Sequence, residues 1–136
     1  MANFTTYLAN KLLGHLTGSS SYTMPTVYVA LFTTNPTLPG SGAGGLDSAA
    51  EASYTGYARA ATSGLWGAAS AESIANSSAI TFAACSGGTS TVIGFGLVDS
   101  SGSGTGNLLV AGTCSLSVSN GITPQFAASQ LTVGIT

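Results

Sequence analysis

The stretch LLVAGTCSLSVSNGI, residues 108–122, decides the fold. Six residues at alternate positions are small or apolar: Leu108, Val110, Gly112, Cys114, Leu116 and Val118. Hydroxyl side chains stand between them from Thr113 to Ser119, so the pattern predicts a strand with one buried face. Asn120-Gly121 then predicts a type I′ hairpin turn, whose two central residues both need positive φ. We expect a return strand over 122–126, where Pro124 marks a sheet edge.

Further strands are expected on both sides of this one. Residues 27–32 (VYVALF) are apolar on both faces, as in a fully covered strand. Shorter strands are predicted over 54–61, 80–82 and 131–135. By contrast, 64–78 is predicted to be a loop with one helical turn.

The range 91–99 predicts a longer strand with two unlike faces. Ile93, Phe95 and Leu97 would lie on one face, and Gly94 and Gly96 on the other. Glycines at alternate positions indicate that another backbone or a large side chain packs closely against that face.

The N-terminal residues have helical periodicity instead. Apolar residues recur at intervals of three and four: Phe4, Leu8, Leu12, Leu13 and Leu16. Asn3 or Thr5 could cap a helix over 1–18, and Gly18 could end it. Residues 39–53 are small and polar and predict a long loop.

These elements predict one domain over 1–136, with the helix in 1–18 and a β domain in 22–136. The expected fold class is mainly β, an antiparallel β-sandwich or small barrel with one N-terminal α-helix.

Charge is scarce along the whole chain. Charged residues make up 4% of it, against roughly 25% in an average soluble domain. With only Lys11 and Arg59 to neutralise phosphates, nucleic-acid binding is not expected. A net charge of −2 gives no attraction to an anionic membrane surface. The weakly charged surface suits a packed assembly, although Ser and Thr could solvate it without any partner.

No signal peptide or membrane-spanning run is visible, so we expect the protein to be made in a cytoplasm. Cys85 and Cys114 have no metal-ligand spacing. They are expected to be buried apolar thiols, with a disulfide as the alternative.

The search for chemistry finds no catalytic, cofactor or metal site, and the chain is not expected to be an enzyme. The four carboxylates (Asp47, Glu51, Glu72 and Asp99) are interpreted as solvated loop charges. His15 is the sole histidine and is expected at the edge of the helix. The glycine-rich range 102–106 precedes a strand, so it lacks the helix N-terminus that a phosphate loop needs.

One cluster is typical of an interface. Tyr54, Tyr57, Arg59 and Trp66 fall within thirteen positions, and Trp, Tyr and Arg are enriched at binding hot spots. Core packing of Trp66 and one tyrosine is the alternative. Leu8 and Leu12 of the helical stripe are further candidate interface residues, against either the sheet or a neighbouring subunit.

Several motifs resemble, in consistent order, those of small structural proteins of tailed bacteriophages. They are 10–13 (NKLL), 22–33 (YTMPTVYVALFT), 54–59 (YTGYAR), 94–99 (GFGLVD), 106–109 (GNLL) and 124–128 (PQFAA). Members of that family are head decoration or tail-fibre-like proteins, and the resemblance carries no catalytic or ligand-binding residues.

The resemblance implies a non-enzymatic virion protein, most simply a capsid decoration (cement) protein. Such a protein would bind the major capsid protein, as a homo-oligomer and by preference a trimer, and would stabilise the shell by binding only its assembled form. The alternative is a tail or tail-fibre-associated protein. A carbohydrate-binding module in which Trp66 stacks on sugars is a remote alternative.

Overall fold

The structure, a computed structural model, describes residues 2–36 and 50–135. Within these residues the elements are β1 Ala2–Phe4, α1 Thr6–Leu16, β2 Tyr28–Phe32, β3 Ala60–Ala61, β4 Ser73–Ala75, β5 Ile80–Thr81, β6 Ser90–Val98, β7 Leu108–Val118, β8 Gln125–Phe126 and β9 Thr132–Gly134. The predicted class, mainly β with one N-terminal helix, is confirmed.

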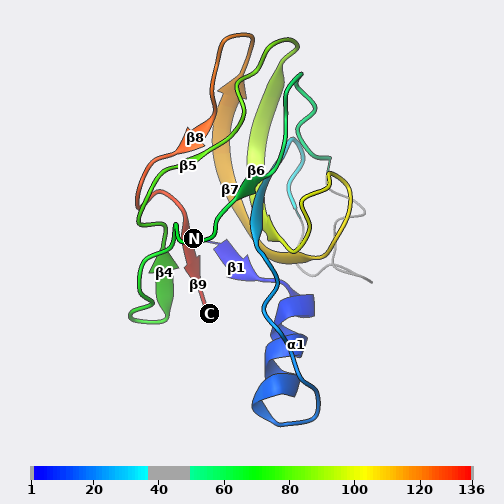
Figure 1. The fold of residues 1–136 in the computed structure, drawn as a ribbon, viewed down its shortest axis with the longest axis vertical. Helices are drawn as coiled ribbons and strands as arrows, with labels where there is room; N and C mark the ends of the chain where they lie inside the picture. The colour runs from blue at the N-terminus through cyan, green and yellow to red at the C-terminus, as the bar shows by residue number, and fades with distance from the viewer. Residues whose placement is uncertain (1, 37–49, 136) are drawn as a thin grey trace.

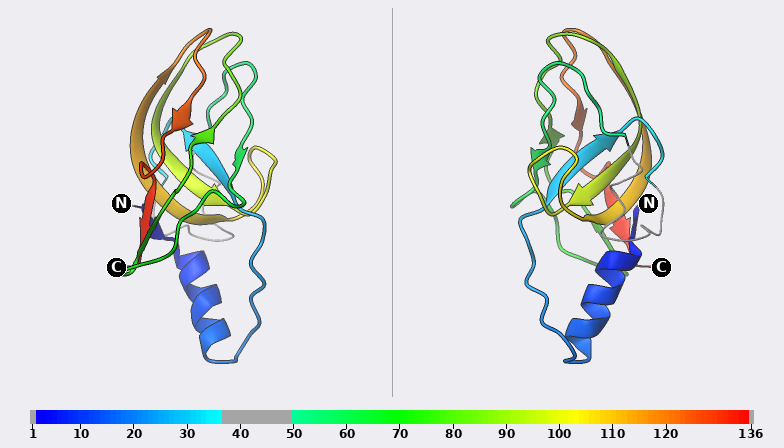
Figure 2. Two further views of the ribbon diagram at one scale, coloured as in Figure 1. Left: turned by 60° about the vertical axis from the view of Figure 1, so that its left-hand side comes forward. Right: turned by 90° about the vertical axis from the view of Figure 1, so that its right-hand side faces the viewer.

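Seven of the strands form one sheet in the order β3-β2-β6-β7-β1-β9-β4. It curls into a half-barrel, and the two-stranded β5-β8 sheet lies inside the curve (Figures 1 and 2). Every pairing is antiparallel except that of β1 with β9, in which Ala2 lies opposite Val133. The first and last strands of the described chain are therefore neighbours inside the sheet, between β7 and the edge strand β4.

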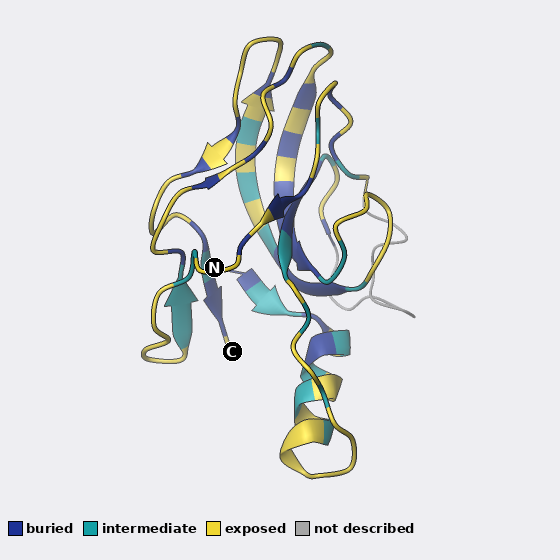
Figure 3. Cartoon of the chain, viewed as in Figure 1, coloured by how far each residue is buried: buried dark blue, intermediate teal, exposed yellow. Residues whose placement is uncertain are grey.

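Buried side chains occupy both faces of the sheet. The larger core fills the concave side, where Phe126 of β8 contacts Phe95 of β6 with ring centroids 5.8 Å apart. A smaller core on the other face contains Ala30, Phe32, Val98, Leu108 and Ala111. Figure 3 shows that α1 is less covered than the sheet, because burial decreases along the helix with distance from the strands.

The β6–β7 pair confirms the close packing predicted at the glycines. A Cβ atom on Gly96 would lie 2.9 Å from the Phe32 ring and closer still to Leu108 Cδ1, and one on Gly94 would lie 2.5 Å from Pro36 Cδ. The predicted face of β6 is wrong at Ile93, which is exposed. A register shift between Val92 and Gly94 breaks the alternation there.

The predicted return strand over 122–126 is wrong in its partner and length. Gly121 has φ 89°, but Asn120 has negative φ, and Ile122 N–H donates to the Ser119 carbonyl at 3.0 Å. This is the signature of a type II turn, whose twist does not match a two-residue hairpin. The chain therefore leaves β7 after the turn, and only Gln125–Phe126 forms a strand, paired with β5.

The predicted N-terminal helix is right for Thr6–Leu16 and wrong for Ala2–Phe4, which form β1. Thr5 separates the two elements, because its hydroxyl donates to the Leu108 carbonyl at 2.6 Å and accepts the Leu8 N–H at 3.3 Å. One side chain thus caps the helix and fixes its start to β7. Periodicity could not show that Phe4 pairs with Val110.

Two other segments differ from expectation. The range predicted to be a loop contains β4, which pairs with β9, and only Ala60–Ala61 of the predicted 54–61 strand is a strand. Most of the predicted loop over 39–53 lies outside the described residues. Of the part that is described, Ala52 N–H donates to the Leu31 carbonyl at 2.9 Å.

The turn before β4 is unusual. Ser70 and Ser73 exchange two backbone hydrogen bonds, of 2.8 and 3.1 Å, around Ala71 and Glu72. Both central residues have positive φ, 50° and 61°, where Asn-Gly would be favoured. Left-handed backbone costs a residue with a Cβ atom roughly 1–2 kcal/mol.

We predict that Gly96→Ala lowers the free energy of unfolding by about 1–3 kcal/mol, because the added methyl group overpacks the contact with Phe32 and Leu108. Chemical denaturation measures the change. Gly67→Ala is the matched control, since its Cβ would meet nothing nearer than 3.4 Å. Equal stability of the two variants would show that the β6 glycines are not needed for close packing.

We also predict that Glu72→Gly raises the free energy of unfolding by about 1 kcal/mol, because glycine relieves the left-handed strain. Thermal unfolding checks this. Glu72→Gln keeps the strain and removes only the charge, so a rise in that variant would assign the effect to electrostatics instead.

Candidate interface: an apolar groove beside the N-terminal helix

The six candidate interface residues separate into two groups in the structure. Tyr54, Tyr57 and Arg59 belong to an internal network, whereas Leu8, Leu12 and Trp66 line one groove. The sequence cluster around Arg59 therefore does not form a single surface.

Arg59 is the centre of the internal network. Its Nε donates to Glu51 Oε1 at 2.9 Å and its Nη2 to Glu51 Oε2 at 2.7 Å, a two-pronged ion pair. The remaining guanidinium nitrogen, Nη1, donates to the carbonyls of Ser100 and Thr105 at 2.7 and 2.9 Å. With its side chain fully buried, Arg59 has no atom left for a partner protein.

Glu51 was expected to be a solvated loop charge, and this prediction is wrong. Its side chain is only 9% exposed. Besides Arg59, it accepts hydrogen bonds from Tyr57 Oη at 2.8 Å and from the Gly104 N–H at 2.6 Å. The carboxylate therefore joins the segment just before β3, which carries Tyr57 and Arg59, to the loop between β6 and β7, which carries Gly104. The sequence signal for this burial of Glu51 was the single arginine of the chain, because a buried guanidinium needs a carboxylate partner.

The environment of Glu51 favours its charged form. Burial by itself would raise the pKa of the carboxyl, but the hydrogen bonds from Arg59, Gly104 and Tyr57 and the positive charge of Arg59 outweigh it and lower the pKa. The Tyr57 hydroxyl has a raised pKa, chiefly because it is buried, and stays protonated to donate to Glu51.

The two tyrosines of the cluster are core residues. Tyr54 is buried and its hydroxyl donates to the Ala83 carbonyl at 3.1 Å. Its ring meets that of Tyr57 edge to face, with centroids 5.5 Å apart. The alternative was core packing of Trp66 and one tyrosine: Tyr54 is a buried core residue, and Trp66 and Tyr57 pack against the core while partly buried.

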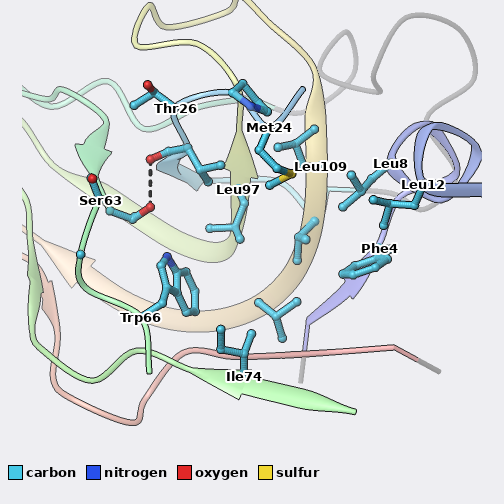
Figure 4. A pocket seen from close by; sticks show the side chains of 16 residues that line it. Phe4, Leu8, Leu12, Met24, Thr26, Ser63, Trp66, Ile74, Leu97 and Leu109 are labelled. Atoms are coloured by element: carbon cyan, nitrogen blue, oxygen red, sulfur yellow. Dashed lines mark hydrogen bonds between the residues drawn. The ribbon is translucent and has the colours of Figure 1, made fainter. Parts of the chain in front are cut away.

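An apolar groove of about 560 Å³ lies between α1 and the β4 side of the sheet. Figure 4 shows its side chains converging from separate parts of the chain. The principal ones are Phe4, Leu8, Leu12, Met24, Trp66 and Ile74. Phe4, Met24 and Ile74 were not predicted as part of any site, because they are far apart in sequence and only the topology brings them together.

The groove lies at the base of a projecting arm, which we define as α1 and residues 17–27. The arm extends away from the half-barrel (Figure 2). Thr62 fixes its returning end, since its N–H and hydroxyl both donate to the Val27 carbonyl, at 3.2 and 2.9 Å. Towards the tip, Leu13 and Leu16 are 59% and 81% exposed, and Met24 on the returning segment is 63% exposed.

The groove is suited to binding apolar side chains of a protein. Trp66 supplies a large half-buried ring, and the walls around it are mainly aliphatic, which is the composition of an interface centre. Exposed leucines on the adjoining arm extend the same apolar surface.

The remaining candidate groups do not form a site. Both cysteines are free thiols; Cys85 is buried, as expected, whereas Cys114 is only half-buried. Burial raises the pKa of the Cys114 thiol to about 11, so it is protonated at neutral pH. Within residues 2–36 and 50–135, no three His, Cys, Asp or Glu side chains are grouped as metal ligands would be. No helix in the described part of the chain has the length and hydropathy to cross a bilayer.

We predict that Glu51→Gln lowers the free energy of unfolding at pH 7 by about 3 kcal/mol, because it leaves the buried Arg59 without its counter-ion. The folded pKa of Glu51 is below its ordinary value of 4.5. This carboxylate therefore stabilises the fold above about pH 4.5, and the stabilisation is lost as the pH falls through the folded pKa.

Urea denaturation between pH 7 and pH 2 measures both effects. The loss of stability on acidification should be smaller in Glu51→Gln than in the unmodified protein. Glu72→Gln, at an exposed position, is the control and should change stability at pH 7 by less than about 0.5 kcal/mol. Equal acid sensitivity of the unmodified protein and Glu51→Gln would contradict the role given to Glu51.

Comparison with known proteins matches most of the chain to one family. The family described as Podophage GP4 fiber I protein gp80 matches residues 3–134, which include the groove, the arm and the internal network. No curated protein sequence matches the chain. The match confirms the resemblance to small phage structural proteins: the chain belongs to the Podophage GP4 fiber I protein gp80 family and is a structural protein of the phage particle.

Proposed function

We propose that this protein is a non-enzymatic structural subunit of the fibre apparatus of a podophage. It joins a neighbouring protein through the apolar groove and the projecting arm. The family match over residues 3–134 supports the fibre location, because the family description names a fibre protein. The tail-fibre alternative from the sequence is thus better supported than capsid decoration.

The observation that carries the joining role is the groove itself. Its walls come from α1, the returning end of the arm, β4 and the central strands, so they are fixed by the sheet rather than by one loop. A preformed apolar surface loses little conformational entropy on binding, so more of its buried area contributes to affinity.

Capsid decoration remains the second candidate, and the same experiment distinguishes it. Purified virions are separated into heads and tails, and the polypeptide is counted in each fraction by quantitative mass spectrometry. A few copies with the tails are expected for a fibre subunit. Hundreds of copies with the heads would replace this proposal by capsid decoration, and absence from both would contradict a virion role.

We predict that Trp66→Ser reduces incorporation into virions about tenfold or more, because it removes the largest apolar side chain of the groove. Ile122→Ser is the control: Ile122 is also a partly exposed apolar residue, 44% exposed, but does not line the groove. Both purified variants are first checked for cooperative thermal unfolding. Normal incorporation of folded Trp66→Ser would remove the groove from the assembly contact.

A glycan array tests the remote carbohydrate-binding alternative. The groove offers few polar groups beside Trp66, whereas sugar binding needs hydrogen-bonding side chains as well as an aromatic face. We expect no specific glycan signal. A signal abolished by Trp66→Ser would instead assign the groove to sugar.

A further inference from the structure

The row of leucines on α1 that forms one wall of the groove extends beyond it to an exposed leucine. Leu8, Leu12 and Leu16 are four residues apart on α1 and lie along one side of the helix. Leu8 is 6% exposed, Leu12 is half-buried and Leu16 is 81% exposed. The chain covers the base of this row and leaves the tip uncovered, so the tip is an apolar surface of the kind that the groove can bind.

Two side chains of opposite charge lie on the elements that border the groove. Among the described residues the only ion pair joins Arg59 and Glu51, and Asp99 accepts hydrogen bonds from Asn107 at 2.6 and 2.9 Å. The other two charged side chains that the structure describes are Lys11 and Glu72, which are exposed and in no ion pair with a described residue. Lys11 lies on α1, over the Tyr7 ring, and Glu72 lies in the turn before β4.

These charges stand on opposite sides of the groove. Leu8 and Leu12 contribute one wall from the helix that carries Lys11, and Ile74 contributes the other from the strand that follows Glu72. Figure 1 shows α1 and the β4 turn on the two sides of the lower end of the molecule. The strained turn places an acidic side chain there at the position where glycine would be relaxed.

We propose that the occupant of the groove is a second copy of this chain. Each arm lies against the groove of the other copy, so that Leu16 enters the partner's groove and Lys11 of one copy faces Glu72 of the other. One chain carries both the apolar groove and the apolar tip, and beside them a cation and an anion that form no ion pair within the described part of the chain. A reciprocal two-fold contact satisfies all four features at once. The inference deepens the proposed function, since it names the first partner of the joining surface.

Charge reversal tests the pairing in solution, with the full chain and no phage component. Sedimentation equilibrium at low salt is expected to give a dimer for the unmodified protein. Lys11→Glu and Glu72→Lys should each weaken association about tenfold, because each places like charges together at both contacts of the pair. Circular dichroism should be unchanged, since both positions are exposed.

Mixing the two variants is the decisive measurement. In a heterodimer, Glu at 11 faces Lys at 72 in one contact, and the native Lys11 faces the native Glu72 in the other. The equimolar mixture should therefore recover the association of the unmodified protein. Failure of the mixture to recover would overturn the facing of Lys11 and Glu72, and a trimer mass would overturn the reciprocal pairing.

The apolar part is tested with Leu16→Ser, whose loss of association is expected to exceed tenfold, against the matched control Ile122→Ser, which should associate normally. An unmodified protein that stays monomeric at the highest soluble concentration would overturn the proposal. These outcomes are independent of virion fractionation: a dimer absent from virions would refute the fibre role alone, and a monomer found with tails would refute the dimer alone.

Discussion

The pairing of β7 with β6 on one side and with β1 on the other is the constraint on which the rest of the molecule depends. β7 is the longest strand, and glycines on both β6 and β7 allow aromatic rings and strands to approach closely enough for the sheet to curl. The curl creates the concave face that the β5-β8 sheet fills. Because Thr5 is fixed to the carbonyl of Leu108, the same strand also sets where α1 leaves the domain, and therefore where the groove lies.

A chain with so few charges uses them in distinct ways. Arg59 and Glu51 are buried and joined, and they connect segments that share no strand pairing with one another. The apolar arm, by contrast, is left uncovered. The buried charges thus hold the fold together, and the exposed apolar side chains are available to a neighbouring protein. For this reason Arg59 and Tyr54, whose residue types are typical of binding hot spots, lie in the interior.

The sequence predicted the fold class because the apolar run of β2 and the alternating patterns of β6 and β7 are local signals, and these three strands are successive neighbours in the sheet. It failed where geometry is set at a distance. Phe4 follows helical spacing yet pairs with Val110, and Asn120-Gly121 forms a turn whose following chain pairs with β5. The groove residues Leu8, Leu12 and Trp66 were predicted individually, but their shared surface with Ile74 depends on β4, which carries no strand pattern.

The position of β1 has a consequence for how the chain is made. Thr5 and its acceptor Leu108 are 103 residues apart, and β1 also pairs with the still later β9. At about 5–20 residues per second on the ribosome, β1 waits several seconds before either partner exists. Contacts so distant in sequence also slow folding after release. The part of the sheet around β1 is therefore completed last, and until β7 and β9 have been made the nascent chain leaves both edges of β1 unpaired and open to its neighbours in the host cell.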